Sequence, residues 1–407
     1  MRERRLPALR PGHHVQLLEG WRELFAAMAQ AIDHGTQEVR LETYIFEFDR
    51  AGEQLAAVLE RAALRGLKVY VVADGAGTEA LPAAWAQRFA RAGVQWLIFR
   101  PLGRLGVLIP SRWRRLHRKL CVVDGRVAFC GGINVLDDWN DPNHGALQHP
   151  RLDFAVRVTG PLVRQVHEAM VRFWARAQAG ARMRAADLGA AWHQLEQAVQ
   201  AERAAAAQAG ARAVDAGVRA ALLLRDNVRH RSQIERAYRK AIAEAREEIL
   251  IANAYFAPGR KLRQALLHAR QRGVRVRLLL QGRYEYFMQF HAVRMMYDML
   301  LAAGLEIYEY TPSFLHAKVA VIDGQWATVG SSNLDPLSLL LAREANVVVQ
   351  DPAFAAQLRQ RLLRAIEQEA RAVDAASFAS RPWPQRLLDR VAFALMRVAV
   401  FLTGNRY

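Results

Sequence analysis

The sequence contains very little cysteine and no long uninterrupted apolar run. Cys121 and Cys130 are its only cysteines in 407 residues. Both fall in one predicted hairpin, which favours small core residues over a disulfide and fits a reducing location. No stretch offers ~20 uninterrupted apolar residues, so we predict no transmembrane span. The charged start of the chain is followed by no apolar run, so we also predict no secretory signal.

Acidic residues are few relative to basic ones. The 57 Lys and Arg residues outnumber the 39 Asp and Glu residues, which gives a formal net charge of +18. Such a charge favours a polyanionic partner, either nucleic acid or an anionic lipid surface, and charge alone does not separate the two. A biased genome rich in Arg and Ala codons also accounts for part of the excess. Since 52% of the residues are hydrophobic, wholesale disorder is excluded.

The dominant positive feature is one pattern that occurs twice. Residues 116–134 and 315–333 both contain His-x-Lys-x-x-x-x-Asp-Gly, followed at identical spacing by Gly and Asn. The offset is constant, because 316 − 117 and 333 − 134 both equal 199. A single His-x-Lys on a strand is common, but two matched copies at one offset exclude coincidence. We therefore expect two similar halves, which a chain of this length is able to build.

The expected secondary structure repeats in the same order in both halves. Apolar periodicity and turn residues predict, in the first half, strands at 38–46, 67–74 and 94–99 and helices at about 52–64 and 80–92. In the second half they predict helices at 231–247, 259–271 and 289–303 and strands at 248–256, 274–280 and 305–310. Each repeated pattern then adds a strand, an Asp-Gly turn and a return strand.

This order predicts an α/β fold class with two duplicated half-domains. Each half is expected to be a mixed, mostly parallel sheet flanked by helices, with the active site at the interface between the halves. We divide the chain into a first half at 1–171, a helical linker at 172–215, a second half at 216–380 and a C-terminal segment at 381–407. The linker is rich in Ala, Arg and Gln, which favours helix.

The C-terminal segment has two interpretations. Its apolar residues are interrupted by Arg386, Asp389, Arg390 and Arg397. The pattern fits an amphipathic helix docked on the globule. It fits equally an amphipathic helix in the membrane interface, whose arginines meet anionic headgroups. The internal charges argue against a full membrane span.

The repeated residues are suited to phosphodiester chemistry. On a strand, residues i and i+2 point to one face, so His117 projects with Lys119 and His316 with Lys318. In one pocket, two ammonium groups would neutralise the non-bridging oxygens while one imidazole attacks phosphorus. The other imidazole would protonate the leaving alkoxide and then deprotonate the incoming nucleophile. Because the lysines supply the positive charge, we predict no metal and no other cofactor.

The other repeated residues have structural alternatives. Asp124 and Asp323 complete the motif and are grouped with the catalytic set, although each precedes a glycine as a hairpin-turn former does. Asn134 and Asn333 are candidate amide donors to the phosphate, or caps of the preceding turns. The second copy has Ser331 and Ser332 where the first has Gly132 and Ile133. This difference predicts serine contacts to phosphate on one side only.

The repeated pattern resembles the HxKxxxxD motif of the phospholipase D superfamily, which occurs twice in its single-chain members. The resemblance runs from about Gln16 to about Leu358. Longer strings at 225–227, 252–259, 308–310 and 328–338 resemble the bacterial cardiolipin synthase B subgroup. This resemblance implies a covalent phosphatidyl-histidine intermediate, with His117 as nucleophile and His316 as general acid/base, although duplication makes the roles nearly interchangeable.

The resemblance also implies two orienting carboxylates, one downstream of each motif. These are Asp153 and Glu344, although an ordinary acid at a strand edge fits each position as well. A further feature is a basic and apolar segment before His117, which fits either a solvated loop or a lip that contacts lipid headgroups. That segment contains Arg100, Arg104, Val107, Leu108, Ile109, Arg112, Trp113, Arg114, Arg115 and Arg118.

The implied function is a cardiolipin synthase that transfers a phosphatidyl group from one phosphatidylglycerol to another and releases glycerol. The expected partners are phosphatidylglycerol, other phospholipids and an anionic membrane surface, with the protein peripheral on the cytoplasmic face of the bacterial cell membrane. The alternative is a phospholipase D-type hydrolase, in which water resolves the intermediate. A nuclease is suggested only by the charge, and we expect no nucleic-acid partner because a basic groove interleaved with aromatic residues is not evident. Intact motifs disfavour a non-catalytic lipid binder.

Overall fold

The computed structural model describes residues 6–78, 80–103, 114–184, 217–226, 230–284, 287–335 and 342–402. The first half contains β1 (Arg10–Glu19), α1 (Gly20–Asp33), β2 (Glu38–Thr43), α2 (Arg50–Leu64), β3 (Lys68–Asp74), α3 (Ala83–Ala92), β4 (Gln95–Phe99), β5 (Lys119–Val123), β6 (Val127–Gly131), β7 (Asn140–Asp141), β8 (Gly145–Ala146), β9 (Phe154–Thr159) and α4 (Leu162–Arg184).

The second half repeats the central part of this order. It contains β10 (Val218–Arg225), α6 (Gln233–Glu244), β11 (Glu248–Asn253), α7 (Arg260–Gln271), β12 (Arg275–Gln281), α8 (Phe287–Ala302), β13 (Glu306–Tyr310), β14 (Lys318–Ile322), β15 (Trp326–Gly330), β16 (Glu344–Gln350), α10 (Pro352–Glu369), β17 (Ala370–Ala372), α11 (Ala375–Ala379) and α12 (Trp383–Leu402). The helices and strands predicted within the two halves are present, with ends that shift by a few residues.

Helix α2 illustrates how the local sequence sets an element. The Asp49 side chain accepts a hydrogen bond from the Gly52 backbone N–H at 2.9 Å and so caps the first turn. The helix buries a face at i, i+3, i+4 and i+7 that includes Leu55 and Leu59, as predicted from the periodicity. The chain then turns at Gly66 with φ +94°, a conformation that strains any L side chain.

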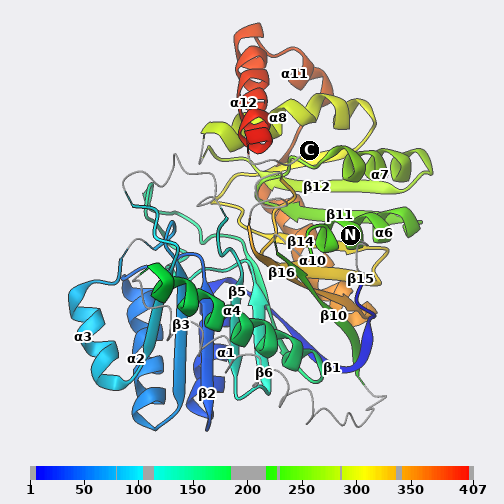
Figure 1. Ribbon diagram of the computed structural model, residues 1–407. Coiled ribbons are helices and arrows are strands. Elements are labelled where there is room, and N and C mark those ends of the chain that lie inside the picture. The colour runs from blue at the N-terminus through cyan, green and yellow to red at the C-terminus, as the bar shows by residue number, and fades with distance from the viewer. Residues whose placement is uncertain are drawn as a thin grey trace.

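The two halves form one continuous sheet, which the sequence did not predict. Fifteen of the seventeen described strands form this sheet, in the order β17-β13-β12-β11-β14-β15-β16-β10-β1-β9-β6-β5-β2-β3-β4 (Figure 1). Strand β1 joins the halves, because it pairs antiparallel with β9 on one side and with β10 of the other half on its second side. The halves are therefore connected through backbone hydrogen bonds as well as side-chain packing.

The mixed α/β fold of two duplicated halves is confirmed, but the expectation of mostly parallel pairing is wrong. Only four of the fourteen neighbouring strand pairs described in this sheet are parallel, namely β2–β3, β3–β4, β11–β12 and β12–β13. These are the strands joined by βα crossovers, which place successive strands parallel. The hairpins β5–β6 and β14–β15 and the strands around β1 are antiparallel.

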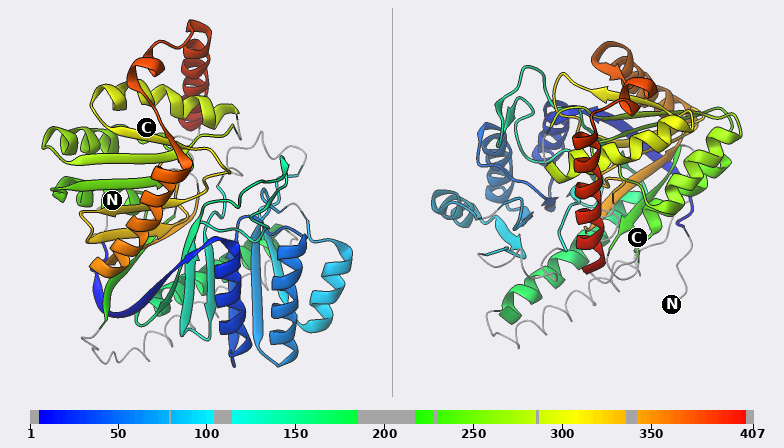
Figure 2. Two further views of the ribbon diagram at one scale, coloured as in Figure 1. Left: turned by 180° about the vertical axis from the view of Figure 1, so that it is seen from behind. Right: turned by 90° about the horizontal axis from the view of Figure 1, so that it is seen from above.

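Helices cover the sheet in layers. In the first half, α1 and α2 pack on the face that carries Val39 and Leu41, while α4 packs on the opposite face with Val122. In the second half, α6, α7 and α8 cover one face, and α10 lies along the other (Figure 2). The faces under α4 and α10 belong to one hydrophobic core shared by both halves. This shared core fixes how the two motif hairpins face each other.

Most of the predicted linker lies outside the described residues, whereas most of the predicted C-terminal segment forms α12. Helix α4 runs to Arg184 and so continues through the predicted boundary between residues 171 and 172. Residues 185–216, most of the predicted linker, lie outside the described part of the chain. At the other end, α12 packs against α8 (Figure 1). No described helix is long and apolar enough to span a bilayer.

Candidate active site

The two motif histidines lie just before paired hairpin strands. His117 precedes β5 and His316 precedes β14, so each lies where the parallel strands β2 or β11 end. Each segment also pairs with the opposite half. The His117 backbone N–H donates to the Arg343 carbonyl at 3.0 Å, and the His316 N–H donates to the Leu152 carbonyl at 2.9 Å. Short parallel bridges therefore hold each histidine beside a segment from the other half.

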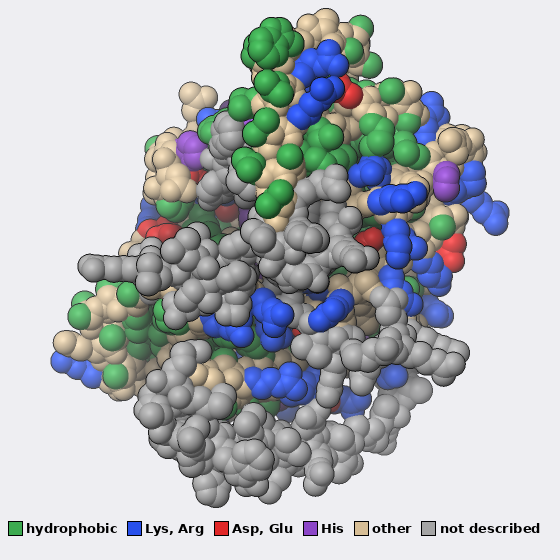
Figure 3. Space-filling view, turned by 45° about the horizontal axis from the view of Figure 1, so that its top comes forward, with side chains coloured by type: hydrophobic (Ala, Val, Ile, Leu, Met, Phe, Trp, Pro, Cys, Tyr) green, Lys and Arg blue, Asp and Glu red, His purple; other side chains and the backbone are tan. Residues whose placement is uncertain are grey.

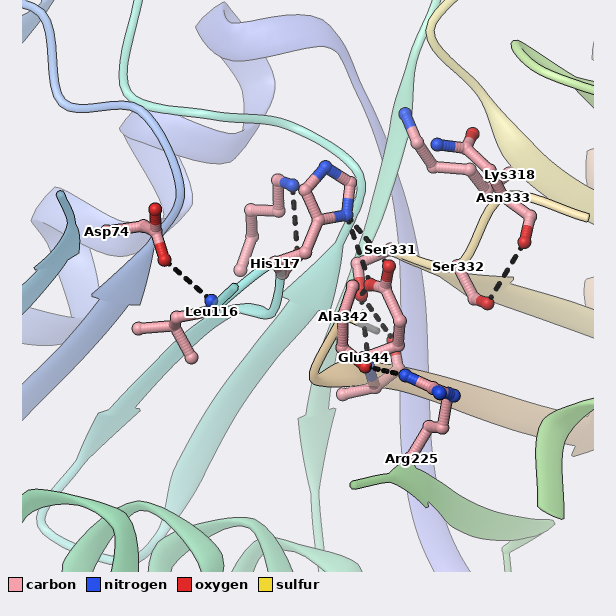
Figure 4. Close-up of polar contacts among 12 residues, drawn as sticks. Asp74, Leu116, His117, Arg225, Lys318, Ser331, Ser332, Asn333, Ala342 and Glu344 are labelled. Carbon is pink, nitrogen blue, oxygen red and sulfur yellow. Dashed lines mark hydrogen bonds and ion pairs between the residues drawn. The ribbon is translucent and has the colours of Figure 1, made fainter. Parts of the chain in front are cut away.

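Because of these bridges, each orienting carboxylate lies beside the histidine of the opposite half. His117 Nδ1 lies 3.0 Å from Glu344 Oε1, and His316 Nδ1 lies 2.6 Å from Asp153 Oδ2. Figure 4 shows the His117 ring directed at Glu344. Both carboxylates are buried, with Glu344 0% and Asp153 2% exposed. Because a carboxylate accepts hydrogen bonds, Nδ1 carries the hydrogen and Nε2 is left to face the reacting group.

The equivalence of the carboxylates follows from the sheet register. Gly131 pairs with Ala155, and Gly330 pairs with Asn346, so Asp153 and Glu344 occupy matching positions at the starts of β9 and β16. Both were predicted as orienting residues. The structure adds that each orients the histidine of the opposite half, so neither half carries a complete histidine–carboxylate pair.

The two lysines are buried beside the histidines. Lys119 Nζ donates to the His117 carbonyl at 2.9 Å, and Lys318 Nζ donates to the His316 carbonyl. Lys318 Nζ also lies 3.8 Å from Asp153 Oδ2. Burial lowers the pKa of Lys119 to about 7, with the charge on Lys318 acting in the same direction. A bound anion would favour the charged form of both lysines.

Burial also shifts the pKa values of His117, His316 and Asp153. It lowers the pKa of His117, although the Glu344 carboxylate opposes the shift. It lowers the pKa of His316 further, and the charges on Lys318 and Lys119 add to the effect. Burial raises the pKa of Asp153 to about 6 against the opposing charge of Lys318. Neutral imidazoles in a cationic pocket are suited to receive a phosphodiester anion.

The predicted asparagines and serines have different surroundings. Asn134 Oδ1 accepts from the Ile45 backbone N–H at 3.2 Å, which leaves its amide hydrogens as donors. The side chains of Asn333 and Lys318 extend in the same direction (Figure 4). Ser331 Oγ donates to Glu344 Oε2 at 2.5 Å, so it holds the orienting carboxylate instead of facing phosphate. Ser332 is buried, and its hydroxyl donates to the Asn333 carbonyl at 3.3 Å.

The motif aspartates lie outside the site. Asp124 and Asp323 are at the far ends of β5 and β14 from the histidines, with φ of 51° and 50°. Asp124 accepts backbone hydrogen bonds from Thr36, Gln37 and Glu38. Asp323 accepts the matching set from residues 246–248. Both fasten a hairpin turn to the preceding helix–strand loop, which is the structural role that their Asp-Gly sequence suggested.

The basic segment before His117 divides into two parts. Residues 104–113, including Trp113 and the apolar run, lie outside the described part of the chain. Arg115 pairs with the buried Asp74. Arg118 pairs with the buried Glu42 at 2.7 Å. These two arginines are therefore internal partners of carboxylates and do not belong to a surface lip.

Three residues near the site were not predicted as site residues. Asp74 Oδ2 accepts from the Leu116 backbone N–H at 2.7 Å and so positions the residue before His117. The Tyr44 ring contacts the His117 ring edge-on, with centroids 5.0 Å apart. Arg225 donates to the Ala342 carbonyl and supports the segment that leads to Glu344 (Figure 4). Asp74 and Tyr44 lie at the carboxyl ends of parallel strands, a position that could have indicated the site.

The assembled groups define a class of enzyme. Two histidines, each with a buried carboxylate from the opposite half, and two buried lysines meet at the interface of a duplicated α/β fold. This is the arrangement expected of a phospholipase D-type enzyme. Within the described ranges, no cluster of three or more His, Cys, Asp or Glu side chains is arranged to hold a metal ion.

Comparison with known proteins identifies the family. Residues 28–147 and 238–366 match the family "Cardiolipin synthase, PLD-like domain". The chain is 37% identical over 396 residues to cardiolipin synthase B of Salmonella typhi, covering 97% of this chain and 90% of that protein. Cardiolipin synthase A of Pseudomonas fluorescens is 31% identical over 88% of this chain and 69% of its own length.

A solved structure shares the fold. Phosphatidylserine synthase of Haemophilus influenzae superimposes with a TM-score of 0.66 at 13% identity, over 98% of this chain and 96% of that one. The chain belongs to the cardiolipin synthase family of phospholipase D-like proteins. This membership confirms the predicted family and the predicted enzyme class, a phosphatidyltransferase, and it implies phospholipid substrates.

Proposed function

We propose that the protein transfers the phosphatidyl group of one phosphatidylglycerol to a second, which forms cardiolipin and releases glycerol. The observation that carries the proposal is the crossed pairing of His117 with Glu344 and of His316 with Asp153, beside two buried lysines. The family membership supports the same reaction. The pairing supplies two imidazoles with their Nε2 atoms available for one phosphorus centre.

In the first step, His117 Nε2 attacks the phosphorus of phosphatidylglycerol. A P–N bond forms as the P–O bond to the glycerol headgroup breaks, and the protonated His316 donates its proton to the departing oxygen. Lys119 and Lys318 stabilise the charge on the non-bridging oxygens. The phosphate anion would also raise the pKa of His316 and so favour the proton that this step consumes.

In the second step, a hydroxyl of the second phosphatidylglycerol attacks the phosphohistidine. His316, now neutral, takes the hydroxyl proton, a new P–O bond forms, and the P–N bond to His117 breaks. The sum is two phosphatidylglycerols converted to one cardiolipin and one glycerol. His316 and His117 both return to their starting protonation states. If water took the place of the alcohol, the product would be phosphatidic acid.

The reaction is tested with purified full-length protein and labelled phosphatidylglycerol in mixed micelles. We expect labelled cardiolipin and free glycerol in equal amounts. Phosphatidic acid as the sole lipid product would make the protein a hydrolase and overturn the transferase proposal. Cleavage of DNA under the same conditions would instead support the nuclease alternative.

The roles of the two histidines are tested by trapping the intermediate. We expect His117→Ala to abolish both turnover and covalent labelling, because the nucleophile is lost. His316→Ala should leave some labelled protein, because the imidazole that attacks phosphorus remains. His268→Ala, on the exposed surface of α7, is the control and should match wild type. Labelling in His117→Ala and none in His316→Ala would mean that the roles are reversed.

We also propose that α12 attaches the protein peripherally to the cytoplasmic face of the bacterial membrane. Its inner face docks through the buried Asp389 and Ala392. Its outer face exposes Trp383, Leu387, Leu388, Val391, Leu395 and Val398. Figure 3 shows apolar side chains gathered over this end of the molecule, with basic side chains beside them. An apolar helix face flanked by arginines fits an anionic bilayer interface.

A further inference from the structure

A cavity of about 280 Å³ opens beside His316. Its lining includes His316 and its partner Asp153, together with Glu47, Asp138 and Asn134. One water needs only about 10–15 Å³ on this measure, so the cavity holds a ligand of several heavy atoms. We propose that this cavity is the polyol subsite, where carboxylates bind the hydroxyls of a glycerol headgroup and thereby select a polyol over water or a simple alcohol. This inference rests on the proposed transferase function.

The internal duplication shows that the acidic lining residues Glu47 and Asp138 are additions to the residues that both halves share. The strand registers and the bridges Phe46–Val135 and Phe256–Leu334 align Glu47 with Ala257. The loop from the motif asparagine to the orienting carboxylate is also longer in the first half, because 153 − 134 is 19 and 344 − 333 is 11. The lengthened loop carries Asp138. The residues that repeat in both halves perform phosphoryl transfer, whereas Glu47 and Asp138, which lack a counterpart, line one side of the site.

Glu47 is held in place by backbone contacts while its carboxylate remains available. Its N–H donates to the Val135 carbonyl at 2.9 Å, and the Val135 N–H donates to the Ile45 carbonyl at 3.1 Å. Partial burial raises the pKa of the Glu47 carboxyl, and the neighbouring Asp49 adds to the effect. Asp138 is 9% exposed, and its Oδ2 accepts from the Trp21 backbone N–H. Carboxylate oxygens accept hydrogen bonds, so they are matched to hydroxyl donors.

The cavity is lined by charges of both signs, with Arg151 beside the carboxylates of Asp141 and Asp153. Burial lowers the pKa of His316, and the charges on Lys318, Lys119, His117 and Arg151 add to the effect. Arg151 is itself committed to Asp141 and to the Asp137 and Asn140 carbonyls. Because carboxylates attract an ammonium group as well as bind hydroxyls, capture of ethanolamine beside glycerol distinguishes the two headgroups.

One subsite of this kind serves both half-reactions. The departing glycerol of the donor and the glycerol headgroup of the acceptor each exchange a proton with His316, so each must place an oxygen at the same point. Binding energy from the second hydroxyl then positions the reacting one. Water lacks a second hydroxyl to bind at Glu47, so the cavity disfavours hydrolysis without excluding water sterically.

The test measures how the phosphoenzyme partitions between acceptors. Full-length protein with phosphatidylglycerol in mixed micelles receives isotope-labelled glycerol, ethanol and ethanolamine together, and the labelled phosphatidylglycerol, phosphatidylethanol and phosphatidylethanolamine are quantified. We expect Glu47→Ala to lower the glycerol-to-ethanol capture ratio roughly tenfold to a hundredfold, as loss of a hydrogen bond to a charged group does. Glu47→Gln should fall between wild type and Glu47→Ala. Because the ratio is set within one intermediate, it is independent of the folded fraction.

The control is Glu367→Ala, which removes an exposed carboxylate on α10 and should leave the ratio unchanged. A glycerol-to-ethanol ratio in Glu47→Ala equal to wild type would overturn the subsite while leaving the transferase intact. A larger loss of ethanolamine capture than of glycerol capture would overturn it in favour of an ammonium subsite. Wild-type protein that captures no alcohol at all would overturn the transferase proposal, and this inference with it.

Discussion

Lys119 shows at the scale of one residue how burial and charge set the working pH of the site. It is 6% exposed, and desolvation moves its pKa from the ordinary 10.5 to about 7. Burial moves Asp153 the other way, to about 6. The lysine must be charged to hold phosphate oxygens, and Asp153 must be ionised to accept from His316 Nδ1. Both conditions are met together only near neutral pH.

We therefore expect a narrow bell-shaped pH profile of kcat/KM, a quantity that reports the free enzyme. Activity should fall below about pH 6 as Asp153 is protonated, and above about pH 7 as Lys119 loses its proton. Lys119→Arg should keep the charge and move the alkaline limb to higher pH, even if its maximum is lower. An alkaline limb that stays in place would assign it to another group. Lys261→Arg, which replaces an exposed lysine of α7, is the control.

At the scale of the element, the hairpins β5–β6 and β14–β15 present the histidine and lysine at one end and an aspartate turn at the other. The aspartates occupy the left-handed region, which Asp and Asn tolerate better than most residues. Each carboxylate satisfies several backbone N–H groups of a neighbouring loop. The role of the repeated Asp-Gly is therefore to stabilise each hairpin more than to take part in the reaction.

Asp124→Ala should lower the free energy of unfolding by about 1–3 kcal/mol, because backbone donors lose their acceptor and alanine disfavours the positive φ. Asp124→Asn should cost less, since it keeps one accepting oxygen and the tolerated conformation. Denaturant unfolding and kcat per folded molecule are measured together. A loss of kcat in a variant of wild-type stability would show that Asp124 has a chemical role.

The backbone hydrogen bonds that the Asp124 carboxylate accepts from Thr36, Gln37 and Glu38 also predict a pH effect on stability. Burial raises the pKa of Asp124, but hydrogen bonds from Glu38, Thr36 and Gln37 outweigh it, so the pKa in the folded state is lowered. A carboxyl with a lowered folded-state pKa stabilises the fold above its unfolded pKa and loses this contribution as the pH falls through the folded value. The stability difference between wild type and Asp124→Ala should thus shrink in acid.

At the scale of the whole molecule, the catalytic groups are divided so that both halves are required. Each histidine depends on a carboxylate of the opposite half, and β1 joins the halves into one sheet. The same arrangement leaves α12 at one end of the molecule with its apolar face outward. The proposed membrane contact on α12 is therefore built on the second half, whereas the site needs residues of both halves.

We expect Leu387→Glu combined with Leu395→Glu to weaken binding to vesicles containing phosphatidylglycerol at least tenfold, because burying one leucine contributes roughly 1.5–3 kcal/mol. Added salt should weaken the wild-type binding as well, since it screens the arginines of α12. Leu64→Glu is the matched control, because Leu64 is 72% exposed on α2 of the first half. Sedimentation with vesicles that is equal for all variants would leave α12 as a docked structural helix.

The sequence by itself determined the duplication and the elements of each half, and it predicted the reacting groups. These depend on local spacing: the i, i+2 pairing of histidine and lysine on a strand, the Asp-Gly turn, and the helix periodicity. It also indicated Asp153 and Glu344, but only through resemblance to a family.

The tertiary structure decided what depends on contacts between distant segments. It placed Asp153 and Glu344 each beside the histidine of the opposite half, and it made most strand pairs antiparallel. It also paired Arg115 and Arg118 with buried carboxylates. It also placed Glu47 in the lining of a cavity beside His316. Strand order and the facing of two halves are set by shared burial across the whole chain, which no local pattern encodes.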